Sequence, residues 1–205
     1  MIRTLLLTSA VIALAACGAP DPEPASAPAA PAAPQPATPP AATPAPANSV
    51  SAEGWGPLRI GMTRAEVETA LGADSNPGAV GGPDPEACDT FHPARAPEGL
   101  TVMVEKGVLT SIWLARAATL KTDRGFGVGD QASAIKAAYG SAASASPHKY
   151  SEPPAEYITA WSSGGGAGYV QNPAARGISY HIGNDGRVQM VAAGGPSIQY
   201  VEGCA

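Results

Sequence analysis

The sequence predicts an α+β domain in which two repeats, each a helix followed by an antiparallel meander, form one sheet with the helices packed on one face. Three observations predict it: two similar helix-start segments at 56–72 and 124–140, alternating apolar and polar residues after each, and glycine-containing turns between the alternating runs. The domain is expected to span 51–205, with the repeats at about 54–118 and 119–205, enough chain to bury a core.

The first repeat opens with a helix whose start is marked by Thr63 and Glu66. Their spacing is that of a capping box, in which the Thr63 hydroxyl accepts from the Glu66 amide and the Glu66 carboxylate accepts from the Thr63 amide. Val67 and Leu71 lie four residues apart and therefore share a helix face, and Gly72 ends the helix.

The second repeat opens with a helix that follows the same pattern at the same offset. Ile135 and Tyr139 take the two apolar positions, and Gly140 ends the helix. The glutamate of the capping box is missing, so Asp130 is expected to be the N-cap.

Each helix is followed by a loop rich in glycine, proline and alanine, and then by runs with a period of two residues. This period predicts half-buried strands that pair with their neighbours through short turns. The expected strands are 88–92, 100–105 and 108–115 in the first repeat, and 157–161, 177–182, 187–192 and 197–201 in the second.

Alternation divides the strand residues between a core face and an outward face. The expected core set is Leu100, Val102, Val104, Ile112, Leu114, Ile178, Tyr180, Ile182, Val188, Met190, Ile198 and Tyr200. The outward face mixes polar and large side chains, which is typical of protein-recognition surfaces. Its candidate binding residues are Trp113, Met103, His181, Arg187 and Gln189, with Trp113 as the expected anchor. In the alternative, the linker or a loop covers Trp113, which then contributes only to stability.

The N-terminus has the pattern of an export signal. Arg3 precedes an apolar run over 5–16, which is shorter than the about 20 residues that span a bilayer. The small residues before Cys17 resemble the lipobox of bacterial lipoproteins, which implies a signal peptide over 1–16 and a diacylglyceryl group on the Cys17 sulfur. The alternative is an ordinary secretory signal with Cys17 as a free thiol.

The lipobox resemblance implies attachment to a membrane through acyl chains such as palmitate on Cys17. Gly18 follows in place of the aspartate that typically retains lipoproteins in the inner membrane, so the resemblance implies an outer-membrane anchor facing the periplasm. The segment 17–50 is rich in proline and alanine, which predicts an extended linker with a reach of roughly 100 Å.

Charge and cysteine content narrow the class of partner. The net charge is −5 and lysine and arginine form no cluster, which argues against nucleic acid as a partner.

In an oxidising envelope, Cys88 and Cys204 are expected to form a disulfide. The alternatives are two buried thiols, or a zinc site of both cysteines with His92 and His181, which lacks paired short ligand spacings.

The run from Leu58 to Val67 resembles the opening of the SmpA/OmlA-type small outer-membrane lipoproteins of the barrel-assembly machinery. The tandem arrangement resembles the β-lactamase inhibitor protein, which is built from two such units. The second unit lacks the Met62-Thr63 pair and Glu66, and no functional residue of either family can be carried onto a position of this chain. The resemblance implies a fold that binds other envelope proteins, with no catalysis and no cofactor.

Three hypotheses of function follow. The first is an adaptor in an envelope assembly, with an envelope protein as its partner. The second is an inhibitor of a periplasmic or secreted enzyme. The third, a small-ligand binder or hydrolase, requires a deep polar pocket that the repeats do not predict. No enzyme activity is expected, because the sequence contains no nucleophile elbow, zinc-protease helix motif or phosphate-binding loop.

Overall fold

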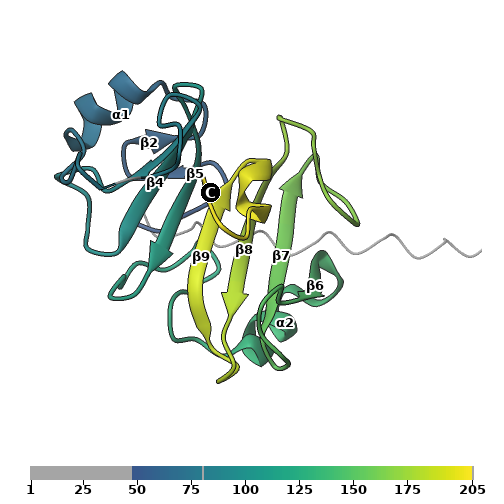
Figure 1. The fold of residues 1–205 in the computed structure, drawn as a ribbon. Helices are drawn as coiled ribbons and strands as arrows, with labels where there is room; N and C mark the ends of the chain where they lie inside the picture. Colours follow the sequence, from purple (N-terminus) through teal and green to yellow (C-terminus); the bar gives the residue numbers. More distant parts are fainter. Residues whose placement is uncertain (1–47, 80, 205) are drawn as a thin grey trace, which may run out of the picture. The chain divides into compact units, whose positions relative to one another are not determined.

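Two α-helices pack against a seven-stranded antiparallel sheet in the computed structural model, and a two-stranded sheet precedes the first helix (Figure 1). The structure describes residues 48–79 and 81–204. The predicted signal peptide, Cys17 and the linker up to residue 47 lie outside these ranges. Within them, no helix is long and apolar enough to cross a membrane. The predicted α+β class is confirmed.

The sheet has the strand order β3-β4-β5-β9-β8-β7-β6, so the last strands of the two halves of the domain pair at its centre. The elements of the first half are β1 (Gly54–Trp55), β2 (Leu58–Arg59), α1 (Arg64–Leu71), β3 (Cys88–Phe91), β4 (Leu100–Glu105) and β5 (Val108–Ala115). Those of the second half are α2 (Ala132–Tyr139), η1 (Gly140–Ala142), β6 (Ala143–Pro147), β7 (Glu156–Ser163), β8 (Arg176–Ile182), β9 (Val188–Gly194) and η2 (Pro196–Gln199).

Helix α1 begins with the predicted capping box. The Thr63 Oγ1 atom accepts from the Glu66 amide at 3.3 Å, and Glu66 Oε2 accepts from the Thr63 amide at 2.7 Å. Val67 and Leu71 are buried against the sheet, as their spacing predicts.

We expect Thr63→Ala to lower the free energy of unfolding by about 1 kcal/mol, because the substitution leaves the Glu66 amide without its acceptor. Urea unfolding measures the loss. Thr69→Ala on the same helix is the control, since the Thr69 hydroxyl only donates back to the Ala65 carbonyl. Equal losses in the two variants would contradict a specific role for the cap.

Helix α2 begins differently from the prediction, and Asp130 as its N-cap is wrong. The N-cap is Gln131, which makes no side-chain cap bond. The Asp130 carboxylate instead accepts from the Gly127 amide at 2.7 Å and pairs with Lys121 at 2.7 Å. The β8–β9 turn supplies the missing cap, because the Gly186 carbonyl accepts from the Ala132 amide at 3.0 Å.

The core lies between the inner face of the sheet and the two helices. Tyr180 is fully buried there, and its hydroxyl lies 3.0 Å from the Thr122 hydroxyl and 2.9 Å from that of Tyr139. Val50, the last residue of the predicted linker, is also fully buried, and its amide donates to the Lys121 carbonyl. The folded part therefore begins before residue 51.

Three residues of the predicted core set are misplaced. Met190, Ile198 and Tyr200 pack in a second cluster on the outer face. In β9, the pairing passes from Met190, opposite His181, to Val188, opposite Ile182, so Gln189 is an extra residue that shifts the alternation.

The last predicted strand, 197–201, is also wrong, because Pro196–Gln199 is the 3₁₀-helix η2, with proline in its first turn. Strand β6 is absent from the prediction. Its residues are alanine, serine and proline, which have low strand propensity, and it forms through pairing with β7.

Candidate functional site

The five residues predicted for an outward binding face do not form one exposed surface. Met103 and Trp113 are only 1% and 5% exposed, so the expected exposed anchor is wrong and the alternative, a covered Trp113, holds. His181 is also buried. Arg187 and Gln189 are exposed at the β8–β9 turn, where Arg187 donates to the Gly129 carbonyl and Gln189 to the Asp185 carboxylate.

The C-terminal segment covers the centre of the outer face. Met103 and Trp113 form a cluster there with Ala192, Ile198 and Cys204. Ser111 on β5 holds this C-terminal segment against the sheet, because its hydroxyl accepts a hydrogen bond from the Ser197 hydroxyl at 3.1 Å. The same hydroxyl accepts from the Trp113 indole N–H at 2.7 Å. Figure 1 shows η2 lying over β8 and β9.

The predicted disulfide between Cys88 and Cys204 is present and anchors this cover to β3. Because both sulfurs are bonded to each other, the alternative zinc site loses its two thiolate ligands. Within residues 48–79 and 81–204, no group of three or more histidine, cysteine, aspartate or glutamate side chains is placed to hold a metal ion.

The rest of the outer face, over β6, β7 and β8, forms a hollow of about 460 Å³. We call it the outer-face hollow. It is lined by Ser144, Ala145, Ser146, Pro147, Lys149, Tyr157, Thr159, Trp161, Gly168, Tyr169, Ser179, His181, Ile198, Gln199 and Val201. A volume of this size is typical of small-ligand sites, and the repeats do not predict it.

The lining of the outer-face hollow combines hydroxyl groups with aromatic rings. Thr159 Oγ1 and Ser179 Oγ lie 3.0 Å apart on neighbouring strands. The Tyr157 ring stacks on His148, outside the lining, with centroids 4.8 Å apart, and packs edge-on against His181 at 4.9 Å. These contacts hold the side chains of β7 and β8 in fixed positions.

His181 has an unusual environment. Its Nε2 atom is buried and has no hydrogen-bond partner. Burial, with a smaller contribution from the nearby His148, lowers the pKa of the imidazole to about 4, and an interaction with the Ile198 backbone acts in the opposite direction. Because Nε2 has no partner, we assign the hydrogen of the neutral ring to Nδ1, where the Ile198 backbone can accept it. The neutral ring therefore presents a lone pair at Nε2.

Strand β6 borders the outer-face hollow and forms one edge of the sheet. It pairs with β7, and in the described part of the chain no backbone hydrogen bond joins its other side to a neighbour. Two tyrosines near this edge are exposed. Tyr150, which follows β6 in the chain, is 62% exposed, and Tyr169, which lines the hollow, is 64% exposed.

The opposite edge, β3, is covered. Ser75, Gly81 and Gly82 lie beside it or at its end: the Ser75 amide donates to the His92 carbonyl at 2.9 Å, and a side chain at Gly81 would collide with Asp89. The two edges of one sheet thus differ, because Gly81 and Gly82 shield β3, whereas β6 pairs only with β7 within the described ranges.

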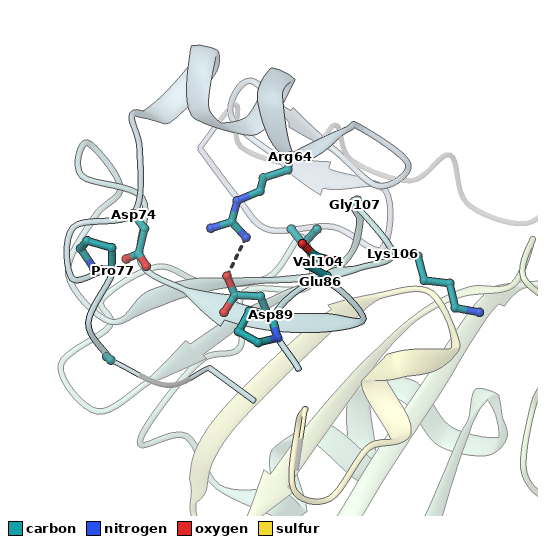
Figure 2. A pocket seen from close by; sticks show the side chains of 10 residues that line it. Arg64, Asp74, Pro77, Glu86, Asp89, Val104, Lys106 and Gly107 are labelled. Atoms are coloured by element: carbon teal, nitrogen blue, oxygen red, sulfur yellow. Dashed lines mark hydrogen bonds and ion pairs between the residues drawn. The ribbon is translucent and has the colours of Figure 1, made fainter. Parts of the chain in front are cut away.

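A second hollow, of about 530 Å³, lies beside α1 and β3 (Figure 2). Arg64 points from α1 toward Asp89 on β3, with Nη1 and Oδ2 2.6 Å apart, and its guanidinium lies 4.4 Å from the Phe91 ring centroid. Glu68 binds the same guanidinium at 2.9 Å. These contacts fasten the helix to the edge strand, so we assign a structural role to Arg64 and Asp89; Asp74, Glu86 and Lys106 also line the hollow.

Comparisons with protein-family models, with curated proteins and with solved structures find no match to this chain.

Proposed function

We propose that this chain is a membrane-anchored envelope lipoprotein whose folded domain is a protein-binding adaptor. Acyl chains on Cys17 hold it at the outer membrane, and the proline-rich linker sets the domain at a distance in the periplasm. The Cys88–Cys204 disulfide supports this location, because such bonds persist in oxidising compartments.

The proposal includes the relation of the domain to the tandem envelope-binding fold. Helix α1 is followed by β3, β4 and β5, and helix α2 is followed by strands that end in β9. Both helices pack on the inner face of the sheet, and the last strand of each half meets the other at the centre. This arrangement supports two repeats of one unit.

The open edge of β6 is the observation that carries the proposal. An edge strand presents a row of N–H and C=O groups that another extended chain can pair with. Proteins that avoid such pairing protect their edges with lysine, bulges or covering loops, whereas β6 has small uncharged residues and only Pro147 at its end. The partner therefore contributes an extended segment of about five residues, the length of β6.

Site-specific photocrosslinking in native membranes tests the adaptor function. A photoreactive residue at Ser144 on β6 is expected to give a discrete protein adduct, and one at Thr69, exposed on α1, is not. Ser146→Lys places a charge on the edge and should reduce the Ser144 adduct about tenfold, whereas Ser146→Ala should leave it unchanged. With Cys17→Ala, the protein should leave the membrane fraction.

Equal labelling from Ser144 and Thr69, or no adduct from either, would contradict the adaptor. If the adduct is a soluble enzyme that loses activity in proportion to the bound chain, the inhibitor hypothesis replaces it. Persistence of the Ser144 adduct in the Ser146→Lys variant would show that the partner binds without pairing to β6.

A further inference from the structure

The outer-face hollow contains a polar atom that lacks a partner. Within the described ranges, His181 Nε2 is the one buried side-chain nitrogen or oxygen without a hydrogen bond. A buried acceptor left unsatisfied destabilises the fold, and native structures contain few of them. His181 is one of the residues that line the hollow, which indicates a site for a group that donates a hydrogen bond.

The lining also defines the charge of the occupant. Lys149 is the only charged side chain among the lining residues, and its ammonium lies 3.5 Å from the Glu202 carboxylate. The described lining of the hollow offers no unpaired charge of either sign, so no ion pair would compensate the free energy of desolvating a charged ligand there. A neutral ligand fits this lining.

The remaining lining combines two kinds of group. Four aliphatic hydroxyl side chains lie on β6, β7 and β8, and the aromatic rings of Tyr157, Trp161 and Tyr169 lie beside them. A sugar ring has a matching surface: one face of apolar C–H groups packs on an aromatic ring, and the hydroxyl groups at its edge both donate and accept.

We propose that the outer-face hollow binds a neutral carbohydrate, with a sugar ring packed on the aromatic lining and a hydroxyl or acetamido N–H donating to His181 Nε2. Because Nε2 itself is enclosed, the donor reaches it when the side chains above the imidazole shift. The same chemistry is offered by the glycan of a cell wall and by a soluble oligosaccharide. The two sites share β6: the sugar site uses side chains on its outer face, whereas the adaptor function uses the open backbone groups of its edge.

Titration of the purified full chain with sugars tests this site. The probes are a β-1,4-linked N-acetylglucosamine tetramer and an α-1,4-linked glucose tetramer, and the readout is the amide NMR shifts of Thr159 and Ser179. At least one tetramer should shift these resonances saturably. His181→Phe keeps a ring but removes Nε2, and should weaken binding about tenfold, as expected for one lost hydrogen bond. His92→Phe, just after β3 in the other half of the domain, should not change it.

Co-sedimentation with insoluble cell-wall sacculi separates the two sources. Sedimentation that the binding tetramer competes away assigns a cell-wall glycan, and tetramer binding without sedimentation assigns a soluble sugar; both support the site. The proposal is overturned if neither tetramer shifts the Thr159 and Ser179 resonances, or if His181→Phe binds as well as the unsubstituted chain. These results report sugar binding at Thr159 and Ser179, whereas the Ser144 adduct reports a protein segment at the β6 edge, so either proposal can fail while the other holds.

Discussion

Replacement of both Cys88 and Cys204 by serine is expected to lower the free energy of unfolding by about 5 kcal/mol, because the disulfide closes a loop with a sequence separation of 116 residues. In the unfolded chain the bond restricts the conformations of more than half of the sequence, and its loss restores that entropy. Urea unfolding followed by tryptophan fluorescence measures the difference.

The same substitution is expected to expose Trp113. The disulfide holds the C-terminal segment over the cluster of Met103, Trp113 and Ile198, and without it this segment is retained only by local contacts. Quenching of tryptophan fluorescence by acrylamide should therefore increase. Cys17→Ser is the control, because it removes a cysteine and leaves the Cys88–Cys204 bond intact. If stability falls and Trp113 stays protected, the cover does not depend on the disulfide.

The sequence predicts the elements with strong local signals. The bounds of β4 and β5 agree with their alternating patterns, and the capping box places the start of α1. These features depend on neighbouring residues, so a single sequence contains the information. The disulfide follows because the chain has few cysteines.

The candidate site depends on interactions that no local pattern reports. Ile198 packs on the outer face because a disulfide and a 3₁₀-helix hold the C-terminal segment there. Met190 lies on the outer face instead of in the core because Gln189 is an extra residue that shifts the alternation along β9. Strand β6 forms because β7 supplies a partner, although its own residues favour other structures. His181 lies on the predicted outward face, but its burial follows from the covering segment.

His181 is expected to make the fold sensitive to acid. Its pKa is about 4 in the folded chain and about 6.5 in the unfolded chain, so above about pH 6.5 the imidazole is neutral in both states and costs nothing. As the pH falls from about 6.5 toward 4, the unfolded state binds a proton that the folded state excludes, and the free energy of unfolding decreases by about 3 kcal/mol.

His181→Phe isolates this contribution. Phenylalanine keeps a ring against Tyr157 and Trp113 but cannot bind a proton, so the difference in stability between variant and parent should grow by about 3 kcal/mol between pH 7.5 and pH 4, in favour of the variant. Urea unfolding at a series of pH values measures it. His148 faces the imidazole across Tyr157 and is present in both proteins. His92→Phe is the matched control and should retain the acid sensitivity, because removing His92 leaves the buried imidazole in place. Parallel pH profiles for His181→Phe and its parent would mean that the folded state does not exclude a proton from His181, which would contradict its burial.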